Sequence, residues 1–189
     1  MKEIRNCNFE GVRNLNADSR MVEGYALVFD SESTDLGGFH EVIDRNALSG
    51  VIEKSDVLCL LNHNEDKGVL ARSNKGKGSL RLQVDEKGLK YSFEAPKTAL
   101  GDELLEGIRR GDISTSSFGF VVGDDQWEKR SDGTYLRTIK TIKELFDVSP
   151  VYKAAYKSTS VNTRGLDTLK QKEKEELEKY YNDLENKLK

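Results

Sequence analysis

The chain has 189 residues, of which 30 are basic and 33 acidic, giving a formal net charge of −3. This balance excludes an overall electrostatic attraction to nucleic acid or to an anionic membrane, and the length suits one domain with a short appendage. No apolar run reaches the roughly 18 residues of a membrane-spanning helix, and the N-terminus leads into no apolar signal segment. We therefore expect a soluble, intracellular protein.

Most of the predicted elements are strands. Apolar side chains at a spacing of two residues predict strands at 24–29, 57–61, 79–84, 89–93, 118–122, 127–130 and 134–137. Glycine-containing polar turns at 85–88 and 131–133 predict two hairpins. This pattern, with few helices, predicts an α+β domain built around a mostly antiparallel sheet or barrel.

Two helices interrupt the strands. A short helix is predicted at 44–53, and a longer one at 98–110, where Thr98 is the N-cap and Gly111 ends the helix. Arg109 and Arg110 fall in its last turn, where basic side chains interact favourably with the negative end of the helix dipole.

The composition changes at residue 165. We expect one folded domain over 1–164 and a charged helical tail over 165–189, in which leucine and tyrosine recur at helical spacing. Two interpretations of the tail stay open: a solvated helix, or a short coiled coil that pairs subunits.

Metal chemistry is not expected. Two cysteines, Cys7 and Cys59, cannot by themselves build a disulfide framework or a four-ligand zinc site. Two histidines, His40 and His63, also argue against histidine-rich metal chemistry. Cys59 lies inside an apolar run, which is typical of a buried small hydrophobe. We therefore expect no metal and no cofactor.

The two histidines are the candidates for a general base, because the imidazole pKa lies near neutrality. His63 follows an apolar strand, where packed neighbours can anchor it beside a cleft. His40 lies in a glycine-rich segment that we expect to be a loop with nothing to fix the ring. Either histidine could instead be purely structural.

Four consecutive hydroxyl residues, 114–117, supply candidate nucleophiles. In a strand, Phe118 and Phe120 should point into the core and Ser117 away from it, and Gly119 should leave the Ser117 face bare for a substrate backbone. The alternative is that these hydroxyls only satisfy turn amides.

An acid inside an apolar strand completes the set. Asp147 lies between Phe146 and Val148, where a carboxylate is costly unless it has a partner. It could orient an imidazole or serve as a structural acceptor. Glu144 is the other acid in this segment, and it could be a plain surface charge.

Taken in order, these segments resemble the prohead protease family of tailed bacteriophages. The motifs that carry the resemblance are 23–29, 35–41, 46–48, the histidine motif 61–64, then 69–72, 87–89, the serine motif 111–120 and the closing motif 145–151. Together they span roughly residues 4 to 162.

The resemblance implies a serine endopeptidase with the fold of the herpesvirus assemblins, a mostly antiparallel closed β-barrel surrounded by a few helices. It implies an enzyme packaged inside the procapsid, in the host bacterial cytoplasm, that cleaves the scaffold protein, the N-terminal region of the major capsid protein, or both, with itself as a further candidate substrate. We also expect a homo-oligomer, a dimer, and no binding to nucleic acid or a membrane. The alternative is a non-catalytic capsid or scaffold component with the same barrel.

By motif position, the resemblance makes His63 the general base, Ser117 the nucleophile and Asp147 the third member. Ser116 is the fallback nucleophile, because the family often has a bulky residue at that position. For the oxyanion hole, the backbone amides of 117–119 are the first choice, with Arg109 and Arg110 as charged alternatives.

Overall fold

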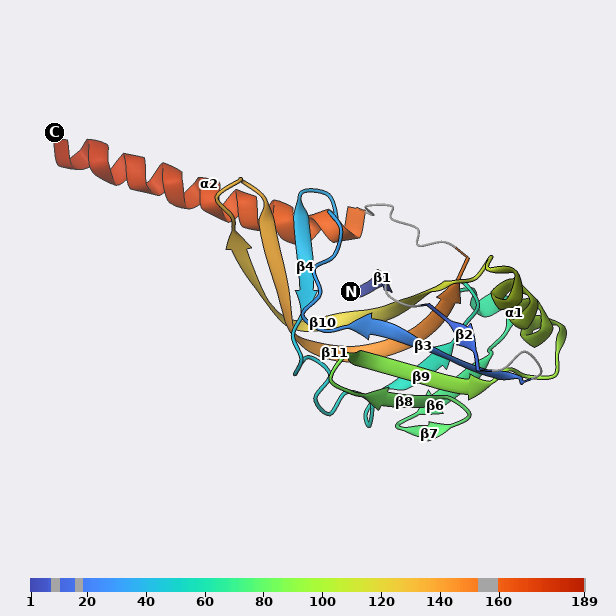
Figure 1. Ribbon diagram of the computed structural model, residues 1–189. Coiled ribbons are helices and arrows are strands. Elements are labelled where there is room, and N and C mark those ends of the chain that lie inside the picture. Colours follow the sequence, from blue (N-terminus) through green and yellow to red (C-terminus); the bar gives the residue numbers. More distant parts are fainter. Residues whose placement is uncertain (8–10, 16–18, 153–159, 189) are drawn as a thin grey trace.

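The computed structural model describes residues 1–7, 11–15, 19–152 and 160–188, and it shows an α+β fold dominated by strands (Figure 1). One sheet has the order β1-β10-β11-β5-β6-β7, with β4 also paired to β11. The other has the order β2-β3-β9-β8. The elements are β1 (Lys2–Cys7), β2 (Arg13–Asn14), β3 (Met21–Val28), β4 (Phe39–Ile43), β5 (Asp56–Cys59), η1 (Glu65–Lys67), β6 (Ala71–Asn74), β7 (Lys77–Gly78), β8 (Arg81–Val84), β9 (Gly88–Glu94), α1 (Ala99–Arg110), β10 (Thr115–Lys129), β11 (Tyr135–Val151) and α2 (Ser160–Leu188).

The long hairpin of β10 and β11 organises the larger sheet. Its two strands run antiparallel from Lys129↔Tyr135 to Thr115↔Val151, with irregularities in register between residues 119 and 125. The turn at 131–133 predicted the tip of this hairpin. The long strands were predicted only as separate short ones, because the charged residues near the irregularities interrupt the apolar alternation.

A single main core lies under both sheets. Its fully buried members come from β3 and β9 of the smaller sheet and from β5, β10 and β11 of the larger one; they include Leu27, Tyr91, Cys59, Phe120 and Leu145. Helix α1 packs on this core through Leu104, and it begins and ends as predicted: Thr98 accepts from the Gly101 N–H, and Gly111 has a left-handed φ of 78°.

The predicted helix at 44–53 is wrong. This segment is a succession of turns, in which the N–H groups of Ala47 and Ser49 donate to carbonyls three residues earlier. The Asp44 side chain accepts from the Asn46 backbone, which competes with helical bonding, and Gly50 has a φ of 66°.

Helix α2 lies beside the hairpin tip and β4 and then extends beyond the body (Figure 1). Leu166 is buried in a small cluster with Phe39 and Tyr135. Farther along, Leu177 and Tyr181 are 54% and 57% exposed. The first turns of α2 therefore pack on the body of the fold. The distal part of α2 carries exposed leucine and tyrosine side chains at the helical spacing noted in the sequence. No helix in the described ranges is long and apolar enough to cross a membrane.

Candidate active site

The hairpin carries a serine and an acid on one face. Ser117 of β10 lies across from Ser149 of β11, and Gly119 lies across from Asp147. Because side chains alternate between the faces of a strand, Phe118 points the other way, into the core. Ser117 and Asp147 therefore lie on the same side of the sheet.

The strand beside β11 leads a histidine to this face. β5 pairs in parallel with β11 at Asp147, so the chain leaving β5 passes alongside the acid. The Asn62 N–H then donates to the Pro150 carbonyl at 2.9 Å, which ties the segment carrying His63 to β11.

A tight turn sets the direction of His63. Asn62 and His63 have φ values of 56° and 57°, and the Asn64 N–H donates to the Leu61 carbonyl at 3.1 Å. Positive φ at both central residues is the mark of a type I′ turn, and asparagine and histidine adopt this conformation more readily than most residues. The backbone thus holds the imidazole in a conformation that is costly for most side chains, as is common at functional sites.

The three candidate side chains lie in contact. His63 Nδ1 is 2.5 Å from Asp147 Oδ1, and His63 Nε2 is 2.6 Å from Ser117 Oγ. When Nδ1–H donates to the carboxylate, Nε2 is left free to accept the Ser117 proton. This order of contacts, acid to imidazole to hydroxyl, can activate a serine for nucleophilic attack.

Asp147 has three partners inside the protein. It is 1% exposed; Ser149 Oγ donates to Oδ1 at 2.8 Å, and Lys2 Nζ lies 2.9 Å from Oδ2. Burial by itself raises the pKa of Asp147. The hydrogen bond and the charge interaction with His63, and then the hydrogen bonds with Lys2 and Ser149, together lower this pKa by more than burial raises it. The pKa therefore lies below its ordinary value of 3.8, and the acid is ionised at neutral pH.

Strand β1 covers Ser117. Asn6 lies opposite Ser117 in the β1–β10 ladder, and Ser117 is 0% exposed. The expectation of a bare, accessible face is therefore wrong for this structure. At Gly119, the space that a side chain would use is taken by the Asp147 carboxylate and by Lys2.

The covering strand also competes for the serine proton. Ser117 Oγ lies 2.8 Å from the Arg5 carbonyl oxygen as well as 2.6 Å from His63 Nε2. A hydroxyl has one proton, so it donates to only one of these acceptors at a time.

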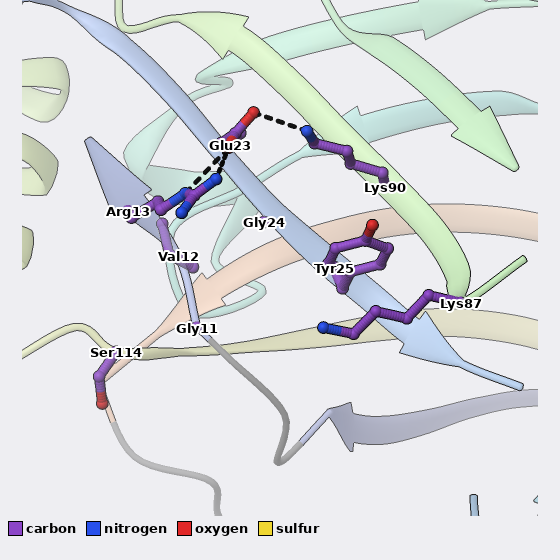
Figure 2. Close-up of a pocket in the computed structure, with 9 residues that line it drawn as sticks. All are labelled: Gly11, Val12, Arg13, Glu23, Gly24, Tyr25, Lys87, Lys90 and Ser114. Carbon is purple, nitrogen blue, oxygen red and sulfur yellow. Dashed lines mark hydrogen bonds and ion pairs between the residues drawn. The ribbon is translucent and has the colours of Figure 1, made fainter. Parts of the chain in front are cut away.

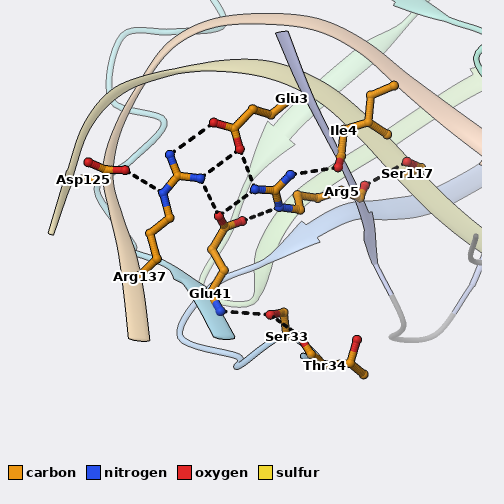
Figure 3. Close-up of polar contacts among 9 residues, drawn as sticks. All are labelled: Glu3, Ile4, Arg5, Ser33, Thr34, Glu41, Ser117, Asp125 and Arg137. Atoms are coloured by element: carbon orange, nitrogen blue, oxygen red, sulfur yellow. Dashed lines mark hydrogen bonds and ion pairs between the residues drawn. The ribbon is translucent and has the colours of Figure 1, made fainter. Parts of the chain in front are cut away.

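A buried ionic cluster holds β1 in place (Figure 3). Glu3 and Arg5 of β1 form ion pairs with Arg137 of β11 and Glu41 of β4, and Asp125 of β10 pairs with Arg137. Local sequence patterns do not predict this cluster, because it joins charged residues that are up to 134 positions apart.

The other candidates lie elsewhere. Ser116 Oγ bonds to the Tyr91 hydroxyl at 2.8 Å on the core face, away from His63. His40 is not on a loop but within β4, where its Nδ1 lies 2.9 Å from the Ser33 carbonyl. Glu144 is exposed.

The remaining alternatives are structural. Arg109 pairs with Glu106 at the exposed end of α1, and Arg110 pairs with Asp112. Cys59 is fully buried, and burial raises the pKa of its thiol well above the ordinary value, so it is a packed thiol rather than a thiolate.

A separate polar pocket of about 520 Å³ lies where β2, β3 and β9 meet the start of β10 (Figure 2). In it, Glu23 pairs with Arg13 and with Lys90. It contains none of the three contacting residues. Among the described residues, no group of three or more histidine, cysteine or acidic side chains is arranged to hold a metal ion.

Two comparisons relate the chain to known proteins. The family model described as caudovirus prohead serine protease matches residues 9–174. Among solved structures, the capsid assembly protease gp21 of bacteriophage T4 is similar, with a TM-score of 0.45 and 12% identity, over 81% of this chain and 98% of that one. No curated protein matches the chain significantly.

Proposed function

The chain belongs to the caudovirus prohead serine proteases, and we propose that Ser117, His63 and Asp147 are its catalytic residues. The observation that carries this proposal is the chain of short contacts from Asp147 through His63 to Ser117. The substrates that we propose are the scaffold protein and the N-terminal region of the major capsid protein, cleaved inside the procapsid in the host cytoplasm.

The proposed mechanism uses each residue at a defined atom. His63 Nε2 takes the Ser117 proton as Oγ attacks the peptide carbonyl carbon, and the imidazolium then donates that proton to the leaving amine. Water, deprotonated by the same nitrogen, releases the acyl group and restores Ser117. Asp147 keeps Nδ1 protonated and stabilises the imidazolium between these steps.

The tetrahedral oxyanion needs donors that are already in position. Successive N–H groups of β10 point alternately toward β1 and toward β11, so we propose those of residues 117–119 that lie on the β1 edge. Such donors contribute about 3 kcal/mol each to transition-state stabilisation. Arg109 and Arg110 are poor alternatives, because both are exposed and already paired on α1.

A substrate can reach Ser117 only after β1 moves. β1 is an edge strand with a single neighbour in its sheet, β10, so its release exposes a row of β10 backbone groups for an incoming extended peptide. We propose that the described state is closed, and that the protease itself is one of its substrates because β1 lies at the nucleophile.

The finer architecture that we propose is the one that the family resemblance implies. We propose that the two sheets form a closed barrel over residues 1–164, in which the edge strand β1 meets β3 by packing and not by strand pairing. The one core that the inner faces of the sheets share supports this. We further propose a dimer, to which the exposed stripe of Leu177, Tyr181 and Leu184 on α2 contributes.

The test is co-expression of the full chain with its cognate capsid and scaffold proteins, followed by mass spectrometry of the new termini. Wild-type protein should generate discrete capsid and scaffold termini, and Ser117→Ala should generate none. Undiminished cleavage by Ser117→Ala would refute the nucleophile assignment. No cleavage by wild type, with normal incorporation into particles, would favour a non-catalytic assembly component.

A further inference from the structure

The structure contains an extended peptide segment at the candidate nucleophile, namely its own strand β1. This strand pairs antiparallel with the Ser117-bearing strand, and the Arg5 carbonyl is the one that lies against Ser117 Oγ, at 2.8 Å (Figure 3). A peptide bound in the same register would place its scissile carbonyl at the position of Arg5. The side chain of Arg5 then marks the position of the substrate residue before the cleaved bond.

That position is built for an arginine. Arg5 Nε donates to Glu41 Oε1 at 2.7 Å, and Arg5 Nη2 donates to Oε2 at 2.9 Å, so one carboxylate binds two nitrogens of the guanidinium. Glu41 is only 4% exposed, and the Phe120 ring lies 5.8 Å from the guanidinium carbon. A bidentate carboxylate and an aromatic face match a planar guanidinium better than an ammonium.

Glu41 is itself held in position. Its backbone N–H donates to Ser33 Oγ at 2.9 Å, and its Oε2 accepts from Arg137 Nη1 at 3.0 Å. β4, which carries Glu41, pairs in parallel with β11 at Arg137. The carboxylate therefore belongs to the body of the fold and not to β1.

A second position lies two residues earlier along β1. Arg137 donates to both carboxylate oxygens of Glu3, at 2.9 and 3.1 Å. Residues two apart in a strand point to the same side, so the side chains of Glu3 and Arg5 lie on one face of β1. On that face, Arg137 binds the acid and Glu41 binds the arginine. When β1 leaves, Arg137 keeps Glu41 and Asp125 as partners, but Glu41 loses its bidentate arginine.

We propose that Glu41 is a specificity-determining residue that selects arginine immediately before the scissile bond, with Arg137 selecting an acidic residue two positions earlier. This inference rests on the proposed proteolytic function and names its substrate class: extended peptides with the pattern acid, any residue, arginine. Applied to the chain itself, it places a cleavage between Arg5 and Asn6.

The test uses the full-length protein and decapeptides that copy residues 1–10, with arginine, lysine or citrulline at the fifth position. Citrulline has nearly the shape of arginine but no charge. Wild-type protein should cleave the arginine peptide after that residue, with kcat/KM about 100-fold above that of the citrulline peptide and with lysine between them. Because β1 competes equally with every peptide, it does not alter these ratios.

Glu41→Gln should reduce the arginine-to-citrulline ratio to about one. Both peptides are cut by the same folded molecules, so the ratio does not depend on the folded fraction. Glu32→Gln is the matched control, because Glu32 also pairs with an arginine, Arg130, but lies outside the cluster; it should leave the ratio unchanged.

The outcomes separate the two proposals. An unchanged ratio in Glu41→Gln overturns the specificity inference, as does cleavage at another bond. If wild-type protein labels at Ser117 with a serine-reactive phosphonate yet leaves the arginine peptide intact, the specificity inference fails alone. If Ser117 does not label and no peptide is cleaved, the proposed function fails as well.

Discussion

Gly119 and Asp147 face each other across the β10–β11 pair, and the acid occupies the space that a side chain at residue 119 would need. A methyl group at Gly119 would overlap Asp147 Oδ2 and lie 2.6 Å from Lys2 Cε. The glycine is therefore required by the acid, and not by its backbone angles, because residue 119 is absent from the positive-φ glycines among the described residues.

We expect Gly119→Ala to lower kcat/KM for peptide cleavage by displacing Asp147 from His63. A double-mutant cycle with Asp147→Ala checks the route of this effect. If the glycine acts through the acid, the double variant should be no less active than Asp147→Ala alone. Additive losses would show that Gly119 acts in another way.

We expect Asp147→Asn to lower kcat by about 10⁴, the scale seen when the acid of a serine protease triad becomes an amide. The amide favours the wrong imidazole tautomer while keeping the shape of the site. Steady-state cleavage of the best peptide measures this, and Glu144→Gln is the matched control because Glu144 is an exposed acid of the same strand. Equal losses in both variants would contradict the assignment of Asp147.

We expect Ser117 to react faster when β1 is held less firmly. Glu3→Ala removes two bonds to Arg137, so a serine-reactive phosphonate should label Ser117 faster than in wild type. Ile4→Ala is the control, because Ile4 is a neighbouring residue of the same strand and is 46% exposed. A labelling rate that does not respond to Glu3→Ala would mean that β1 does not limit access.

Acid should destabilise the fold partly through Glu3. Burial raises the pKa of Glu3, but Arg137 and Arg5 lower it below its ordinary value of 4.5. The unfolded chain therefore binds the proton more tightly, so the stabilisation is present above that value and is lost as the pH falls through the folded-state pKa. Urea unfolding between about pH 5 and pH 3 should show a smaller loss of stability for Glu3→Gln than for wild type. The exposed Glu53→Gln should follow wild type.

Helix α2 should contribute stability through its first turns only. Leu166 is 2% exposed, so Leu166→Ala should lower the free energy of unfolding by about 2 to 4 kcal/mol. Leu177→Ala, on the exposed part of the same helix, should change it by less than about 0.5 kcal/mol. Denaturant unfolding measures both, and light scattering on the Leu177 variant tests whether the distal stripe pairs subunits.

The sequence was sufficient to predict the elements that rest on local signals. The β10–β11 turn, the caps of α1 and the inward direction of Phe118 all follow from turn chemistry and alternation. Asp147 could be singled out because an acid among apolar neighbours needs partners, and its partners are now visible. The catalytic roles of Ser117, His63 and Asp147 stay predictions.

Strand β1 could not be predicted in the same way. Its residues mix charged and polar side chains with one isoleucine and one cysteine, so no apolar alternation marks it as a strand. It is held by its ladder with β10 and by ion pairs with β4 and β11, far away in the sequence. Local patterns contain no information on such pairs, so both the burial of Ser117 and the Glu41 position were missed.

The central claim is that the imidazole of His63 activates the hydroxyl of Ser117, and site-resolved mass spectrometry of a phosphonate adduct tests it most directly. In wild-type protein the adduct should map to Ser117, and it should be absent from His63→Ala. An adduct on Ser116, or equal labelling of Ser117 without the imidazole, would contradict the claim.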